Sequence, residues 1–186
     1  GVPQNDLEAV QWYRRATKQG HVLAQANLGY MYRAGRGVPQ NDVEAVRWYR
    51  WAAMQGHGLA QVNLGGMYRS GRGVPQNDAE AVKWYRRAAV QGEAVGQNGL
   101  GYMYAEGRGV SQNDVEAVKW YRRSAVQGEA AGQTSLGYMY AEGRGVQQDY
   151  VAGYMWSDLA VSRANSGERN RAVRQRDRLA QQMTRG

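Results

Sequence analysis

The side chains that could carry out chemistry in this chain are few, and their spacing does not suit a reaction. The 186 residues contain no cysteine and two histidines, His21 and His57, which lie 36 positions apart. The absence of cysteine excludes thiol nucleophiles, disulfide scaffolds and zinc ribbons. Equivalent positions in packed helices lie roughly 9 to 10 Å apart, too far for both imidazoles to bind one metal ion. None of the seven serines has a histidine at a spacing typical of a nucleophile. We therefore expect no catalytic residue, no metal site, no cofactor and no enzymatic activity.

The glycine-rich segments could suggest phosphate binding, but their setting differs from that of a phosphate-binding loop. The segment Gly35-Arg36-Gly37-Val38 has close copies further along the chain. A phosphate-binding loop connects a strand to a helix, and no strand pattern precedes these segments. We interpret them as the places where helices end.

These segments belong to an internal repeat that organises almost the whole chain. The same spacing of 36 residues separates five tryptophans: Trp12, Trp48, Trp84, Trp120 and Trp156. A unit of 36 residues is too short to bury a core by itself, so neighbouring units must stack against one another. The sequence therefore predicts an array of stacked units.

Each unit is predicted to contain two helices, which we call helix A and helix B. In residues 43–55, Ala45, Val46 and Tyr49 recur at the helical spacing of three and four, which predicts helix B. Asn41 precedes Glu44 by three positions, the spacing of a capping box. Helix A is predicted over residues 22–34. The predicted organisation is helix B alone in residues 1–19, repeats at 20–55, 56–91, 92–127 and 128–163, and a capping segment at 164–186 whose helix spans about 168–183.

One glycine recurs inside every helix A, although glycine destabilises a helix by about 1 kcal/mol relative to alanine. The positions are Gly29, Gly65, Gly101 and Gly137. We expect helix A to approach its helix B so closely at this point that no side chain fits. The alternative is neutral drift after a recent duplication.

One complete copy of the repeat carries a specific set of motifs. The set runs Leu64-Gly65-x-x-Tyr68, Gly71-x-Gly73-Val74, Asp78, Ala81 or Val82, Trp84-Tyr85 and Ala88-Ala89-x-x-Gly92. This pattern resembles the Sel-one-like repeat (SLR) family, a relative of the tetratricopeptide repeat, over residues 1 to about 163.

The resemblance implies an all-α, right-handed α/α solenoid that binds other proteins or peptides without catalysis of its own. Members are often bacterial and exported, which favours a periplasmic or secreted location and leaves a cytoplasmic one open. Several members contain a cysteine pair in each repeat, whereas this chain has no cysteine. No apolar run reaches the roughly 18 residues of a membrane helix, so we expect no membrane insertion.

The positions of helix A that differ between copies trace a single helical face, because they are spaced one and three residues apart. Alignment with tetratricopeptide repeats places this face on the concave side, where the related family holds peptides. There, arginine would bind carboxylates, asparagine a peptide backbone, and tyrosine would offer a flat contact. The predicted binding residues are Asn27, Tyr30, Arg33, Asn63, Arg69, Asn98, Tyr102, Glu106, Tyr138 and Glu142. The predicted function is a protein-interaction scaffold or adaptor, and the alternative is that this face is merely tolerant surface.

The net charge of +8 is divided unevenly along the chain. Residues 1–91 hold 12 basic and 6 acidic side chains, residues 92–163 hold 6 and 8, and residues 164–186 hold 6 and 2. A stripe that binds duplex nucleic acid should not reverse its sign, so this pattern disfavours nucleic acid. The alternative function is binding of an anionic polymer, either nucleic acid or a cell-envelope glycan, by the basic N-terminal half and the arginine-rich cap.

The helix B at the start of the chain lacks a preceding helix A. This arrangement predicts that Val10, Tyr13 and Ala16 lie bare. Stacking surfaces of this kind are apolar and favour association. We expect self-association through residues 1–19, or fraying of that helix.

Overall fold

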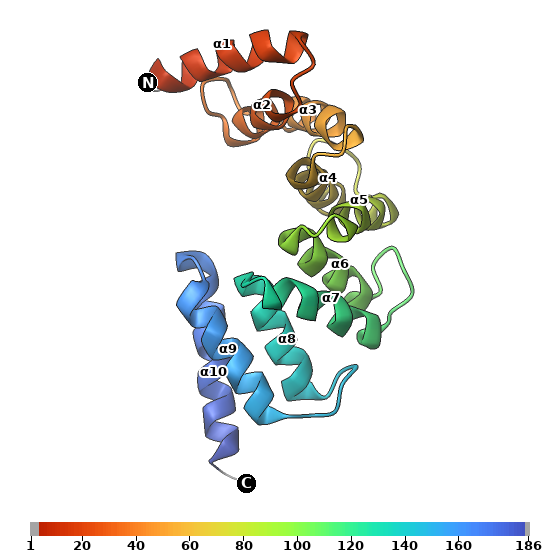
Figure 1. The fold of residues 1–186 in the computed structure, drawn as a ribbon, viewed down its shortest axis with the longest axis vertical. Helices are drawn as coiled ribbons and strands as arrows, with labels where there is room; N and C mark the ends of the chain where they lie inside the picture. The colour runs from red at the N-terminus through yellow and green to blue at the C-terminus, as the bar shows by residue number, and fades with distance from the viewer. Residues whose placement is uncertain (1–3, 185–186) are drawn as a thin grey trace. The chain divides into compact units, whose positions relative to one another are not determined.

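The computed structural model describes residues 4–184, and every regular element in that range is an α-helix (Figure 1). The helices are α1 (Gln4–Lys18), α2 (Val22–Ala34), α3 (Asp42–Met54), α4 (Gly58–Ser70), α5 (Asp78–Val90), α6 (Ala94–Glu106), α7 (Asp114–Val126), α8 (Ala130–Glu142), α9 (Tyr150–Arg163) and α10 (Ser166–Met183). The A helices are α2, α4, α6 and α8, and the B helices are the odd-numbered ones. The predicted all-α repeat fold is confirmed.

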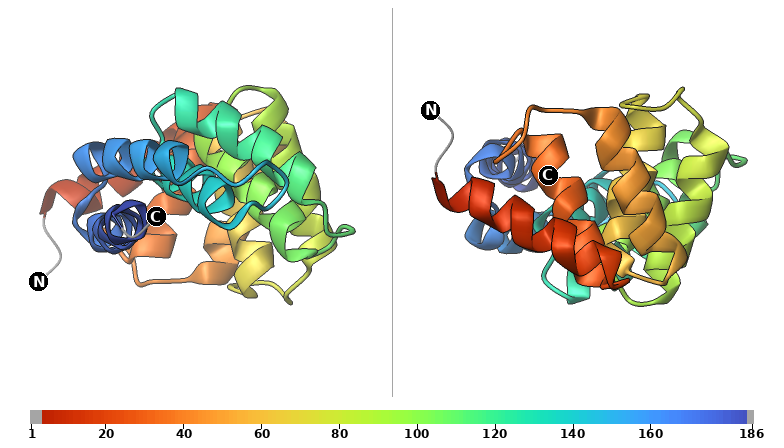
Figure 2. Two further views of the ribbon diagram at one scale, coloured as in Figure 1. Left: turned by 90° about the horizontal axis from the view of Figure 1, so that it is seen from below. Right: turned by 90° about the horizontal axis from the view of Figure 1, so that it is seen from above.

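The chain forms two compact units, unit 1 over residues 1–88 and unit 2 over residues 89–186, which divide within the last turn of α5. In unit 1, α2 packs between α1 and α3, and α3 packs in turn against α4 (Figure 2). In unit 2, α7 packs between α6 and α8, and α9 covers the other side of α8. Each unit therefore has its own core, in which leucines and methionines of the A helices meet alanines, valines and tyrosines of the B helices.

The turns follow the local signals of the sequence. Asn41 accepts a hydrogen bond from the backbone N–H of Glu44 at 3.0 Å, as the capping box predicts. Helix α2 ends at Gly35, whose φ of +67° lies in the left-handed region that glycine favours. Gly37 has a second constraint, because a Cβ there would overlap the backbone carbonyl of Asp6. Both glycines of this loop have a left-handed backbone, and only at Gly37 would a side chain also overlap the backbone of an earlier helix.

The recurring glycine of helix A does lie at a close helix crossing, so that interpretation is confirmed. A Cβ on Gly29 would lie 2.9 Å from the ring of Tyr49, and one on Gly101 would lie 2.8 Å from the ring of Tyr121. In the last repeat, Ser157 stands where the tyrosine is expected. There a Cβ on Gly137 would lie 2.7 Å from the Ser157 hydroxyl oxygen, so the crossing stays tight with a smaller partner.

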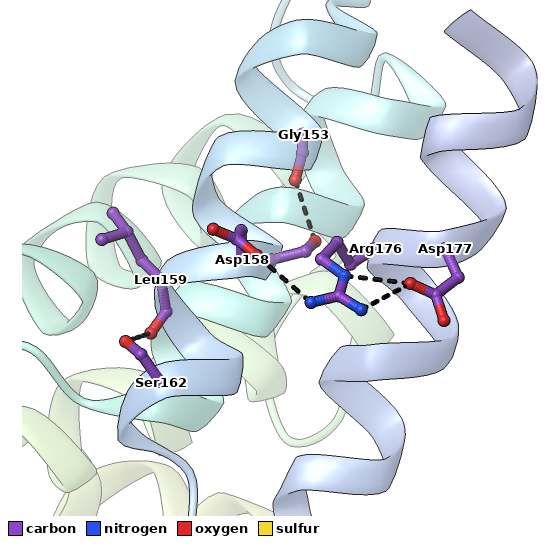
Figure 3. Close-up of polar contacts among 7 residues, drawn as sticks. Gly153, Asp158, Leu159, Ser162, Arg176 and Asp177 are labelled. Atoms are coloured by element: carbon purple, nitrogen blue, oxygen red, sulfur yellow. Dashed lines mark hydrogen bonds and ion pairs between the residues drawn. The ribbon is translucent and has the colours of Figure 1, made fainter. Parts of the chain in front are cut away.

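Helix α10 packs against both α8 and α9, as the next helix A would do. It begins two residues before the predicted start, and its Ala172 and Leu179 are buried. Arg176 donates to the Asp158 carboxylate of α9 at 3.3 Å and to the neighbouring Asp177 (Figure 3). In the preceding repeat, Arg122 of α7 donates to Tyr140 of α8, which is also 18 residues away. Helix α10 therefore keeps the register of the repeat, but its bond to α9 has the donor on the second helix and the acceptor on the first.

In helix α1, the apolar side chains that the structure exposes are not the ones that were predicted to be exposed. Val10 is 2 % exposed because it packs against Leu28, Met31 and Val38, so its predicted exposure is wrong. Tyr13 and Ala16 are half-buried, and the exposed large apolar side chains of α1 are Leu7, at 45%, and Trp12, at 65%.

Candidate binding surface on the A helices

Each A helix leaves one stripe of side chains at least partly open to solvent, at the spacing i, i+4, i+7 and i+11. We call this the A-face stripe. Its members are Leu23, Asn27, Tyr30 and Ala34 on α2; Leu59, Asn63, Gly66 and Ser70 on α4; Val95, Gly99, Tyr102 and Glu106 on α6; and Ala131, Ser135, Tyr138 and Glu142 on α8. The first position is aliphatic in every copy, and the third is tyrosine in all but α4.

In unit 1 the stripe lies beside two arginines at equivalent positions, Arg33 and Arg69. The Arg33 guanidinium lies 5.7 Å from the centre of the Tyr30 ring, a cation–π contact. Its Nε atom is buried without a hydrogen-bond partner among the described residues. Burial raises the pKa of Tyr49 beneath it, and the Arg33 charge opposes that rise. Both arginines are half-buried, which restricts the positions that their guanidinium groups can take.

In unit 2 the charge on the stripe is acidic. Glu106 and Glu142 are both exposed at the C-terminal end of their helices. The Glu142 carboxylate lies 3.5 Å from the Arg178 guanidinium of α10, so the last helix partly neutralises it. Tyr138 is exposed, whereas Tyr102 is half-buried. Among the described residues, Glu142 has an ion-pair partner and Glu106 has none. With α10 docked, a ligand of unit 2 would therefore find the Glu106 carboxylate unpaired.

Asn98 lies off the stripe. Its carboxamide oxygen accepts a hydrogen bond from the Ser135 hydroxyl at 3.4 Å, which places it between α6 and α8. The ten predicted residues thus fall into two sets: Asn27, Tyr30, Arg33, Asn63 and Arg69 in unit 1, and Asn98, Tyr102, Glu106, Tyr138 and Glu142 in unit 2.

The arginines in the loops that follow the A helices form ion pairs that the sequence pattern did not predict. Arg36 donates two hydrogen bonds to the carboxylate of Asp6, 30 residues earlier, at 3.0 and 2.7 Å. Arg72 makes the same pair of bonds to Asp42, at 3.1 and 2.9 Å. Asp6, and after it Tyr30, raise the pKa of Arg36 above its ordinary value. Each of these arginines therefore links the loop after a helix A to the start of the helix B that precedes it.

Buried glutamines form a second link between layers, again over 30 residues. Gln97 donates to the backbone carbonyl of Ala89 at 3.2 Å and accepts from Gln127 at 2.8 Å. Gln25 accepts in the same way from Gln55 at 2.7 Å. The sequence did contain a signal for this link, because every helix A has a glutamine at the same position among mainly apolar neighbours.

Within residues 4–184 no group of three or more acidic or histidine side chains is placed to hold a metal ion. In the same range, no helix has the length and apolar character needed to cross a membrane.

The comparison with protein families decides the relationship. The model of the Sel1 repeat matches residues 1–21, 22–57, 58–93, 94–129 and 130–165. This chain belongs to the Sel1 repeat family. Sel1 repeats are generally protein–protein interaction scaffolds, and proteins built from them are typically not enzymes.

Several solved structures are similar to this chain. One is c5321, a protective antigen with an SLR fold from uropathogenic Escherichia coli, with 40% identity, a TM-score of 0.79 and coverage of 86% of this chain and 34% of that one. Another is a Sel1 repeat protein from Oxalobacter formigenes, with 37% identity, a TM-score of 0.79 and coverage of 86% and 65%. The cysteine rich protein B of Helicobacter pylori has 25% identity, a TM-score of 0.55 and coverage of 70% and 96%. The chain thus spans about a third of the first and 65% of the second. The comparison with curated proteins found no match.

Proposed function

We propose that this Sel1 repeat chain is an interaction scaffold that binds polypeptide segments on its A-face stripes. The stripe of unit 1 takes a segment that carries carboxylates. One observation supports this assignment above the others: α2 and α4 each contain a single charged residue, and both are arginines at the same register, Arg33 and Arg69. Guanidinium groups bind carboxylates with two parallel hydrogen bonds, which gives both affinity and orientation.

The other side chains of this stripe suit an extended peptide. Asn27 and Asn63 occupy equivalent positions and offer carboxamides to a peptide backbone. Leu23 and Leu59 are 67% and 53% exposed, so they provide apolar contact at the start of each stripe. In contrast, α6 and α8 each contain a single charged residue that is acidic. The stripe of unit 2 therefore prefers a segment with cationic side chains.

The test is selection from a phage library of random peptides of about nine residues, followed by sequencing. We expect wild-type protein to enrich Asp and Glu, and the double variant Arg33→Ala/Arg69→Ala to lose that enrichment. The double variant Arg47→Ala/Lys83→Ala is the matched control, because it removes the same charge from exposed positions of α3 and α5 in the same unit. Acidic enrichment that disappears equally with the control would show attraction by net charge alone and overturn the assignment.

We also propose a bacterial origin and a periplasmic or secreted location. The support is the family and the bacterial sources of the similar structures. Fractionation of the source cells with an antibody against this chain tests the location, and recovery in the cytoplasmic fraction alone would overturn it.

A further inference from the structure

The third position of the A-face stripe differs in one helix. It is Tyr30 in α2, Tyr102 in α6 and Tyr138 in α8, but Gly66 in α4. A Cβ on Gly66 would find one neighbouring atom within 4 Å beyond its own helix, the Tyr85 hydroxyl oxygen at 3.5 Å, which is an ordinary contact. Packing therefore does not require glycine here, and Gly66 itself is partly open to solvent.

In two other repeats, the tyrosine at the position equivalent to Gly66 interacts with the arginine of the loop that follows its helix. Asp6 and, to a smaller extent, Tyr30 raise the pKa of Arg36, and Asp114 and, to a smaller extent, Tyr138 raise the pKa of Arg144. Arg72 is the equivalent arginine in the loop after α4, and its side chain is 46% exposed while it binds Asp42. With Gly66 in the stripe, α4 supplies no tyrosine for Arg72.

We propose that the space beside Gly66 receives a tyrosine side chain of the bound polypeptide, so that the partner supplies the ring that α4 lacks. Its hydroxyl faces the Arg72 guanidinium and the Tyr85 hydroxyl, while acidic residues flanking it reach Arg33 and Arg69. Charge complementarity selects the acidic context, since no acidic side chain lies on α2 or α4. This inference rests on the proposed function and names the partner side chain that gives unit 1 its specificity.

The experiment uses the same peptide library with variants of the one position. Gly66→Tyr restores the residue that the other three A helices carry, and Gly66→Leu fills the space without a hydroxyl. Gly66→Ala is the matched control, because it leaves most of the space open. We expect wild type and Gly66→Ala to enrich tyrosine within acidic peptides, and both larger substitutions to lose tyrosine while keeping Asp and Glu.

Synthetic peptides from the wild-type selection then give the magnitude. Replacing their tyrosine by phenylalanine should weaken binding by about tenfold, as expected for a hydrogen bond to a charged group. Acidic enrichment with no change of tyrosine content between wild type and Gly66→Tyr would overturn this inference and leave the proposed function standing. Loss of acidic enrichment in wild type itself would overturn the proposed function and this inference with it. Thermal melts of each variant confirm that it is folded.

Discussion

Glycine has several distinct roles within one repeat, and the neighbours of each position tell them apart. Gly35 supplies a left-handed backbone, and Gly37 leaves room for the carbonyl of Asp6. Gly65 lies at a helix crossing, where a Cβ would be 3.0 Å from the Tyr85 ring. Gly66, the next residue, has none of these constraints. Adjacent glycines against the same tyrosine should therefore respond oppositely to substitution.

We expect Gly65→Leu to lower the free energy of unfolding by about 1–3 kcal/mol, because Tyr85 is buried and cannot move aside. Gly66→Leu should be neutral or stabilising by up to about 1 kcal/mol, since leucine has the higher helix propensity. Urea unfolding of the two variants measures the difference. Equal loss of stability in both would contradict the close crossing.

Successive layers are held in register by polar pairs as well as by apolar packing. The glutamine link is intact at Gln97 but incomplete in the last repeat, where Arg163 stands at the position equivalent to Gln127. Gln133 is 2% exposed, and its carboxamide oxygen has no hydrogen-bond donor among the described residues. A buried acceptor without a donor lowers stability by about 1–3 kcal/mol. A hydrogen-bond donor from α9 to Gln133 of α8 should therefore raise the stability of the protein.

We expect Arg163→Gln to supply the missing donor to Gln133 and to stabilise the protein by about 1 kcal/mol. For a chain of this size, that gain raises the melting temperature by about 2–4 °C. Arg163→Ala is the control, because it removes the arginine without adding a donor. A melting temperature of Arg163→Gln no higher than that of Arg163→Ala would show that the link does not form.

The first helix gives unit 1 a surface that the inner repeats do not have. Trp12 is 65% exposed, while the equivalent Trp84 is 8% exposed within the core of unit 1. Leu7 on the same helix is 45% exposed. Since inner copies of this tryptophan are covered by neighbouring helices, the bare copy offers a stacking surface for another molecule.

We expect the chain to self-associate through α1, with an average mass in light scattering that rises with protein concentration. Trp12→Glu should keep it monomeric. Gln11→Glu adds the same charge at the neighbouring exposed position and should associate like wild type. A chain that is monomeric at every concentration would contradict this expectation.

The sequence by itself determined the features that depend on contacts within one repeat. The period of 36 residues is read directly from the recurring tryptophans. The paired helices, the cap at Asn41 and the turn at Gly35 follow from side chains a few positions apart. The crossing at Gly29 was also predictable, because a costly residue kept in every copy implies a shared steric cause.

Only the tertiary structure decided which neighbour meets each helix face. Helical spacing placed Asn98 among the predicted binding residues, but the approach of α8 turned it toward Ser135. In the same way, α2 buried Val10 and left Trp12 bare. The pair of Arg36 with Asp6 joins residues 30 positions apart, so no local pattern announces it. The spacing of residues along a helix determines the direction of a side chain around that helix. The packing of neighbouring helices determines which residue, or solvent, that side chain meets.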